Sequence, residues 1–321
     1  MPRKLFVVVV VTLALAAVAA GVPGMVGAED SSAKSRPEGA MTLWQAVVLG
    51  AVEGLTEYLP VSSTGHLLVA EEFMGLDKSD SGGDEDARKE ASDAYAICIQ
   101  AGAILAVLGL YRDRVRQMLH GVFGKDPTGL RIAVAIVAAF VPAAVIGLLF
   151  DKAIKAHLFG IWPVAAAWFV GGLAILGFTW WRDRDQERGR GYKSLEHINI
   201  RMSLVIGFMQ CIAMWPGVSR SLVTIVGGLL VGLSLASAVE FSFLLGLVTL
   251  GAATSYDALK HGKLMLQMFD ALPLIVGLVA AFIFAVISVK WMVSYLNRHS
   301  LAIFGYYRVL AAVLVSAWML F

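Results

Sequence analysis

Residues 272–293 read LPLIVGLVAAFIFAVISVKWMV, an apolar run in which Lys290 is the only charged residue. Five more blocks of about 18–22 residues lie near residues 94–111, 130–150, 161–181, 238–255 and 301–320, and a helix needs about 20 residues to cross a bilayer. The chain is 58% hydrophobic and 16% charged, whereas soluble domains carry about 25% charged residues. The blocks therefore predict an all-α integral membrane protein with six transmembrane helices.

Two further apolar regions, about 42–75 and 199–234, are each interrupted near the middle by polar and helix-breaking residues. The first break reads PVSSTGH over residues 60–66, and the second reads PGVSRS over residues 216–221. Non-helical backbone at membrane depth is tolerated only where it is buried in protein or lines a water-filled cavity. We therefore expect two re-entrant helical hairpins, each of which enters and leaves the membrane on one side.

Loop charges and a weak internal similarity suggest the topology. Basic residues concentrate in the loops of residues 112–131 and 182–193, and such loops stay in the cytoplasm, so both chain ends and the acidic segment 77–93 are expected outside. Aligning Gly50 with Gly207 pairs Glu53 with Gln210, although chance similarity is the alternative. The order of elements predicts an inverted repeat with halves of about 41–181 and 199–321, which places a functional site near the midplane.

The N-terminal region is set apart from the membrane domain, which we expect over residues 41–321. Arg3 and Lys4 precede an apolar run, and a small-x-small cleavage site follows, so residues 1–28 are predicted to be a signal peptide and residues 29–40 a polar linker. An uncleaved extra helix is the alternative. Cys98 and Cys211 have no CxxC partner and are interpreted as packing residues. The net charge of +2 gives no indication of nucleic acid binding.

Two carboxylates precede the first break. Glu53 and Glu57 are four residues apart and share one face of a helix. A charged residue at bilayer depth costs about 2–3 kcal/mol or more, so each carboxylate needs a cation, a proton or a hydrogen-bond donor. A divalent cation, Mg²⁺ or Ca²⁺, suits carboxylate ligands. A solvated, inactive pair near the membrane interface is the alternative.

The first break also contains three hydroxyls and an imidazole. Ser62, Ser63 and Thr64 would lie at a helix N-terminus, where hydroxyls and backbone N–H groups bind phosphate oxygens. His66 has an imidazole that titrates near neutral pH, so it can act as acid, base or nucleophile. The combination with two nearby carboxylates favours a catalytic role over a structural one.

The second break contains one arginine between two serines. Arg220, flanked by Ser219 and Ser221, has a permanently charged guanidinium that binds phosphate in bidentate fashion. A salt bridge to Glu53 or Glu57 is the alternative, and a substrate could displace part of it. Further along, Glu240 and Arg308 lie in or near spans, where pairing with each other is as good an interpretation as contact with substrate.

The motifs resemble those of a known family. The run EGLTEYLPVSSTGH over residues 53–66 resembles the first signature of the bacitracin-resistance type of undecaprenyl-diphosphate phosphatase, and WPGVSRS over residues 215–221 resembles the second. IQAG at 99–102, EFSFLL at 240–245 and the pair at 307–308 also match, and the resemblance covers about residues 41–321. Two features depart from the family pattern. Leu222 and Val223 stand where the family usually has small residues, and the N-terminal extension and an insert near residues 79–90 exceed the usual length.

The resemblance implies a phosphatase that converts undecaprenyl diphosphate to undecaprenyl phosphate and inorganic phosphate, which recycles the cell-wall lipid carrier and confers bacitracin resistance. It implies a multi-pass protein of the bacterial inner membrane, with a site open towards the periplasm and a divalent cation, Mg²⁺ or Ca²⁺, at Glu53 and Glu57. Membrane lipids are further expected partners, and a homodimer is an assembly to test.

The site predicted in this way has two groups of residues. The catalytic residues are expected to be Glu53, Glu57, Ser63, His66 and Arg220, and the substrate-binding residues Ser62, Thr64, Ser219, Ser221 and Gln210. Whether Ser63, His66 or water attacks phosphorus stays open.

Two rival functions are weighed against this one. A lipid phosphatase of the acid-phosphatase type is disfavoured, because that class needs a histidine soon after its arginine and none follows Arg220 until His261. A polyprenyl-phosphate transporter with the same fold is the stronger alternative, because interrupted helices in inverted repeats are a transporter architecture. The clustered carboxylates, serines and histidine exceed what simple binding requires.

Overall fold

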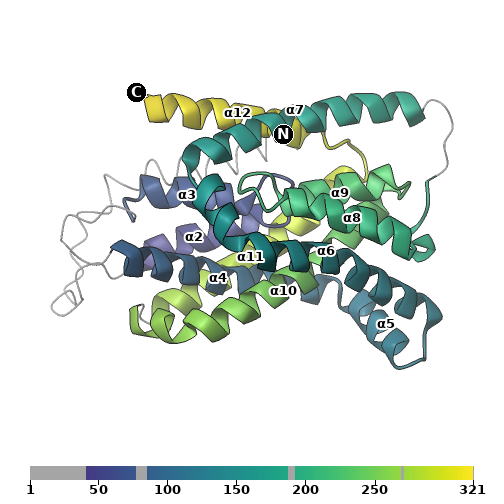
Figure 1. Cartoon of the computed structure of the whole chain (residues 1–321), viewed down its shortest axis with the longest axis horizontal. Coiled ribbons are helices and arrows are strands. Elements are labelled where there is room, and N and C mark those ends of the chain that lie inside the picture. The colour runs from purple at the N-terminus through teal and green to yellow at the C-terminus, as the bar shows by residue number, and fades with distance from the viewer. Residues whose placement is uncertain (1–40, 77–84, 187–191, 269–270, 321) are drawn as a thin grey trace.

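The computed structural model describes residues 41–76, 85–186, 192–268 and 271–320, and no strand occurs within them. The all-α prediction is therefore confirmed for this part of the chain. The expected signal peptide and linker, residues 1–40, lie outside the described residues. The helices in Figure 1 are α2 (Leu43–Thr56), α3 (Ser63–Phe73), α4 (Glu85–Leu110), α5 (Arg112–Val122), α6 (Pro127–Leu158), α7 (Ile161–Gln186), α8 (Ile200–Ile212), α9 (Arg220–Leu230), α10 (Leu235–Met268), α11 (Ala271–Leu296) and α12 (Ala302–Leu320), with a short 3-10 helix at Leu195–His197.

Five of these helices, α6, α7, α10, α11 and α12, are long and apolar enough to cross a membrane. The predicted span near residues 94–111 meets the same test only together with α5, because the chain bends by 79° between Tyr95–Leu110 and Arg112–Val122. The structure thus has five candidate spans within the described residues, or six if the bent pair counts as one. It is a multi-pass membrane protein.

The two apolar regions with internal breaks each form a pair of short helices. The first pair, α2 and α3, is separated by residues 57–62, and the second, α8 and α9, by residues 213–219. In both pairs the residue before the second helix is a serine with positive φ, 74° at Ser62 and 77° at Ser219. Such backbone costs on the order of 1–3 kcal/mol in a residue other than glycine. The surrounding structure must therefore hold both turns in place.

The first helix of each short pair packs on a long helix from the other half of the chain: α2 packs on α11, and α8 packs on α6. A Cβ atom at Gly50 would meet the carbonyl of Gly277, and one at Gly207 would meet the carbonyl of Ala139. Small residues let helix backbones approach closely inside a membrane, and here they seat the two pairs deep in the bundle. α7 and α12 pack together and cross the top of Figure 1.

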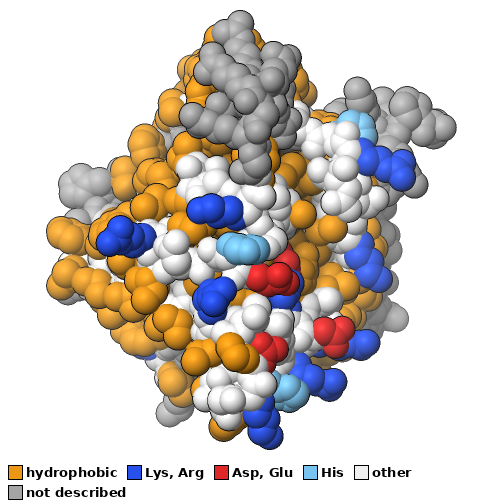
Figure 2. Space-filling model, turned by 90° about the vertical axis from the view of Figure 1, so that its right-hand side faces the viewer, with side chains coloured by type: hydrophobic (Ala, Val, Ile, Leu, Met, Phe, Trp, Pro, Cys, Tyr) orange, Lys and Arg blue, Asp and Glu red, His pale blue; other side chains and the backbone are white. Residues whose placement is uncertain are grey.

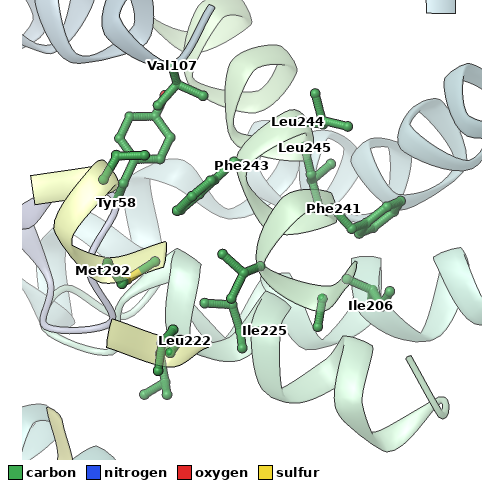
Figure 3. Close-up of a cluster of buried hydrophobic side chains, with 14 of the residues drawn as sticks. Tyr58, Val107, Ile206, Leu222, Ile225, Phe241, Phe243, Leu244, Leu245 and Met292 are labelled. Carbon is green, nitrogen blue, oxygen red and sulfur yellow. The ribbon is translucent and has the colours of Figure 1, made fainter. Parts of the chain in front are cut away.

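The largest buried apolar cluster joins both halves of the chain around the first break (Figure 3). Tyr58 meets Phe243 of α10 edge to face, with ring centroids 5.4 Å apart. Leu222 and Ile225 of α9 belong to the same cluster. Leu222, where the sequence departs from the family pattern, is therefore a packing residue of this core.

Two charged residues near the spans have partners other than those considered from the sequence. Glu240 at the start of α10 accepts a hydrogen bond from Arg114 of α5 over 2.7 Å. Arg308 of α12 instead donates to backbone carbonyls. Pairing of Glu240 with Arg308 is therefore wrong, because the bend after α4 brings α5 to Glu240, whereas Arg308 is buried elsewhere.

Candidate active site

The breaks of the two helix pairs meet inside the bundle through hydroxyl groups. Ser221 Oγ donates to the carbonyl of Leu59 over 2.8 Å, and Ser219 Oγ donates to the same carbonyl over 3.5 Å. Ser219 also caps α9 by accepting from the Leu222 N–H at 3.3 Å. The two serines predicted to bind substrate thus join the two breaks, and Ser221 is fully buried.

Glu57 lies at the centre of the residues that this meeting assembles. One carboxylate oxygen, Oε1, accepts from Arg220 Nη2 over 2.9 Å, and the other, Oε2, accepts from the hydroxyl of Ser63. The side chains of Glu57 and Arg220 are only 7% and 11% exposed, so water screens the pair weakly. The salt bridge considered as an alternative for Arg220 is present, and it points the carboxylate at Ser63.

Arg220 is held from three sides. Its Nη1 donates to the carbonyl of Ser242 over 3.0 Å, and its guanidinium carbon lies 5.4 Å from the ring centroid of Tyr58. A Cβ atom at Gly246 would lie 2.8 Å from the guanidinium carbon. Helix α10 therefore fixes the position of the guanidinium, because Gly246 has no side chain that would collide with it. Arg220 Nε is buried and has no hydrogen-bond partner among the described residues.

Glu53 lies one turn before Glu57, and the Glu57 N–H donates to the Glu53 carbonyl over 2.9 Å. Glu53 is 1% exposed, and its Oε1 atom has no hydrogen-bond partner within the described residues. A buried carboxylate oxygen without a donor is costly unless a cation or a proton satisfies it. No group of three or more Asp, Glu, His or Cys side chains comes together in the described part of the chain, so protein ligands alone do not complete a metal site there.

The N-terminus of α3 faces the break with its first turn lacking a side-chain cap. Ser62 occupies the N-cap position but makes no side-chain capping hydrogen bond. Ser63 is the first helical residue, and Thr64 after it is exposed. Unused N–H groups at a helix N-terminus attract anions. This end of α3 can therefore accept phosphate oxygens beside the Ser63 hydroxyl.

His66 points away from the pair of Glu57 and Ser63. Its Nδ1 lies 2.6 Å from the carbonyl oxygen of Ser62, and its Nε2 lies 2.6 Å from the hydroxyl of Tyr307 on α12. The imidazole also lies against Trp168, with ring centroids 4.6 Å apart. Both ring nitrogens are thus occupied, and neither contacts Ser63 in the described structure.

Gln210 has a different place. It is buried on α8, where its Oε1 accepts from Thr249 of α10 over 3.4 Å, and its Nε2 has no partner among the described residues. Sequence reasoning predicted a substrate contact here, which stays a prediction.

Helix α12 contributes two neighbouring residues, of which sequence reasoning considered only Arg308, either as a partner of Glu240 or as a substrate contact. Besides Tyr307, the fully buried Arg308 donates to the carbonyls of Gly217 and Ala167, over 2.7 and 2.8 Å, and to that of Val218 over 3.1 Å. A weaker contact of 3.4 Å reaches Pro60. Arg308 thus binds both breaks. The matching pair at 307–308 was the only signal for this in the sequence.

Comparisons with known proteins find relatives that match most of the chain. A sequence model of the family described as bacitracin resistance protein BacA matches residues 46–314. An undecaprenyl-diphosphatase of Sorangium cellulosum is 46% identical over 276 residues, which cover 86% of this chain and 86% of that protein. Undecaprenyl-diphosphatase 2 of Rhodospirillum rubrum is 42% identical over 86% of this chain and 95% of its own length. Undecaprenyl-diphosphatase 1 of Chromobacterium violaceum is 41% identical over 85% of this chain and 95% of its own length.

Proposed function

The chain belongs to the bacitracin resistance protein BacA family, and from that premise we propose the chemistry of its site. The protein is an undecaprenyl-diphosphatase, a membrane hydrolase that releases inorganic phosphate from undecaprenyl diphosphate and so returns the lipid carrier to cell-wall synthesis. The observation that carries the proposed chemistry is Glu57, which binds the Ser63 hydroxyl with one oxygen and Arg220 with the other.

The diphosphate is held by positive charge and by backbone donors. The Arg220 guanidinium has an unused Nε donor, and guanidinium groups bind phosphate oxygens in pairs. The uncapped N-terminus of α3 adds N–H groups beside Ser63, and Thr64 is exposed there. These donors stabilise the negative charge that develops on phosphate oxygens during transfer.

Ser63 is the nucleophile in this proposal, and Glu57 is its base. Glu57 accepts the hydroxyl proton while Ser63 Oγ bonds to the terminal phosphorus. The bond from that phosphorus to the bridging oxygen breaks, and undecaprenyl phosphate leaves with the proton. Water then attacks the phosphorus of the phosphoserine while Glu57 takes a proton from that water. The bond from phosphorus to Ser63 Oγ breaks, Glu57 returns the proton to Oγ, and inorganic phosphate is released. A hydroxyl paired with a positioned carboxylate is the arrangement that activates serine in this way.

A divalent cation, Mg²⁺ or Ca²⁺, is also proposed at this site. The unpartnered Oε1 of buried Glu53, one turn from Glu57, suits such an ion, and Mg²⁺ commonly binds one or two carboxylates and completes its shell with substrate phosphates and water. When bound, the cation would neutralise phosphate charge. Glu53 would hold it, while Glu57 stays engaged with Ser63 and Arg220.

The two halves of the chain are proposed to form an inverted repeat of re-entrant hairpins. Support comes from the matching positive-φ serines, Ser62 and Ser219. It also comes from the glycines at which α2 and α8 contact the long helices, Gly50 and Gly207. Inverted repeats of this kind place their sites where interrupted helices meet, which is where Glu57 and Arg220 lie.

The orientation in the membrane is proposed from charge. One end of the bundle, where α5 lies in Figure 1, carries basic side chains together with a few acidic ones, as Figure 2 shows. Its exposed basic residues include Arg112, Arg116, Lys193 and Arg201. Tyr95, which donates to the carbonyl of Ala46 near the start of α2, begins the apolar part of α4, whose opposite end leads into α5. Because basic loops stay in the cytoplasm, the first hairpin enters from the periplasmic side of the inner membrane, and the site opens towards the periplasm.

Phosphate release from a polyprenyl diphosphate in detergent tests the proposal. The purified protein is assayed with Mg²⁺ or Ca²⁺ and again with chelator, beside Glu57→Gln, Ser63→Ala and the exposed-surface control Arg201→Ala. We expect cation-dependent release from wild type and the control, and a loss of at least about 10³-fold in kcat for Ser63→Ala and Glu57→Gln. Release by Ser63→Ala near the wild-type rate would refute the serine nucleophile. Lipid binding without any phosphate release by wild type would favour the transporter.

A further inference from the structure

Helix α12 brings the hydroxyl of Tyr307 into contact with His66. Tyr307 and His66 are separated by 241 residues in the sequence, yet the Tyr307 hydroxyl lies 2.6 Å from His66 Nε2. The two rings are also nearly parallel, with an interplanar angle of 9° and centroids 5.7 Å apart. Tyr307 therefore fixes the orientation of the imidazole ring and contacts one of the two nitrogens that can carry its proton.

The partners of the two nitrogens determine which one carries the proton in the neutral ring. His66 Nδ1 lies 2.6 Å from the carbonyl oxygen of Ser62, and a carbonyl oxygen can only accept. Nδ1 therefore carries the hydrogen, and Nε2 has the lone pair. The Tyr307 hydroxyl donates to that lone pair, so Nε2 is not available as a base or nucleophile while the contact persists.

The same carbonyl connects His66 to the reactive serine. The Ser62 oxygen accepts from His66 Nδ1 and also from the His66 backbone N–H at 3.4 Å. Ser62 has the costly positive φ of 74°, and Ser63 is the next residue. The hydrogen bonds from Tyr307 to His66 and from His66 to Ser62 therefore hold the turn that presents Ser63 to Glu57.

The second hairpin lacks this side-chain contact. When Gly50 is aligned with Gly207, His66 falls opposite Val223, which reaches the carbonyl of Ser219 only through its backbone N–H, at 3.2 Å. That hairpin turns with nearly the same φ, 77° at Ser219, without an imidazole. There Ser219 Oγ caps α9, whereas Ser62 makes no such cap, so the contact of His66 and Tyr307 is a support specific to the hairpin that carries the reactive hydroxyl.

We propose that Tyr307 is a positioning residue, which holds His66 as the neutral Nδ1–H imidazole and, through the Ser62 carbonyl, holds Ser63 against Glu57. This inference rests on the proposed function, because it gives His66 a supporting role beside a serine nucleophile. It also removes His66 Nε2 from the candidates for attack on phosphorus.

The test compares Tyr307→Phe with Tyr306→Phe. Tyr307→Phe keeps the ring stacked on His66 and removes only the hydroxyl, whereas Tyr306 is its neighbour with 67% exposure. We expect Tyr307→Phe to lower kcat about tenfold to a hundredfold while KM changes by less than about twofold, since small misplacements of reacting groups cost this much. We expect Tyr306→Phe to match wild type.

NMR of protein with 15N-labelled histidines gives a second readout. The His66 resonances are assigned as those that are missing from the spectrum of His66→Gln. The Nε2 resonance of His66 should shift in Tyr307→Phe and stay in place in Tyr306→Phe. A wild-type kcat together with an unshifted His66 resonance in Tyr307→Phe would overturn the inference. The inference would also be overturned if only Tm fell while kcat and the resonance stayed at their wild-type values. Failure of wild type and Tyr306→Phe to release phosphate would instead refute the proposed function.

Discussion

Gly246 tests whether the exact position of Arg220 matters for activity. In Gly246→Ala the new methyl group would clash with Arg220 Nη1, the nearest atom, and would lie 2.8 Å from the guanidinium carbon. Ordinary van der Waals contact begins near 3.4 Å, so the guanidinium must retreat by roughly 1 Å or more. The end of an arginine side chain can make this movement without unfolding α10, but its 2.9 Å contact with Glu57 will not survive it.

The expected effect is on activity rather than on stability. A displacement of about 1 Å at a site of this kind lowers the rate by about 10²-fold, which corresponds to about 2.7 kcal/mol of transition-state stabilisation. The fold itself should hold or gain slightly, because alanine is about 1 kcal/mol better than glycine inside a helix. kcat and KM for phosphate release, together with Tm, separate the two effects.

Gly251→Ala is the matched control on the same helix. A Cβ atom at Gly251 would meet nothing within 4 Å, so this variant should keep kcat/KM within about twofold of wild type, as expected for a substitution away from special features. Wild-type activity in Gly246→Ala would refute the reasoning that Arg220 must stay where Glu57 and Ser242 hold it. Equal losses in both variants would show that α10 tolerates no alanine, whatever happens to Arg220.

Two other substitutions probe the supports of the site. Gly171→Ala should destabilise the protein by about 2–4 kcal/mol, because its methyl group would clash with buried Arg308. The displaced guanidinium would lose hydrogen bonds to carbonyls that remain buried. Gly177→Ala on the same helix, where a Cβ atom meets nothing within 4 Å, should leave Tm unchanged. Arg114→Ala should cost at most about 1 kcal/mol, since its partner Glu240 is 23% exposed and such pairs contribute little; a larger drop in Tm, or one insensitive to added salt, would contradict this.

The breaks in the two short helix pairs were predictable because they depend on local sequence. Proline, glycine and serine interrupt apolar runs that would otherwise continue as helix. The structure has both breaks but ends α2 at Thr56 and α8 at Ile212, each four residues before the proline of the predicted break. The salt bridge of Arg220 was considered only as an alternative to phosphate binding, with either Glu53 or Glu57 as the partner, because a buried guanidinium needs an anion. The sequence did not decide between the two carboxylates, and the structure selects Glu57.

The partners of His66 and Arg308 were beyond the reach of sequence reasoning. Tyr307 and Pro60 contact these residues across more than 240 positions, and nothing local to either end signals such a contact. For Arg308, pairing with Glu240 was one of two alternatives and is wrong, because backbone carbonyls of Pro60, Gly217 and Val218 at the two helix breaks accept from its guanidinium. Carbonyls freed by broken helices leave no mark in the sequence.

The long-range contacts of Arg308 also bear on how the protein is made. Membrane proteins emerge from the ribosome from the N-terminus onwards, so the first signature is inserted long before α12 exists. Until α12 arrives, the carbonyls of Gly217 and Ala167 have no guanidinium, and His66 has no tyrosine. The site is therefore complete only after α12 has been made, and we expect a chain that contains both signatures but lacks α12 to hydrolyse the lipid more slowly than the whole protein.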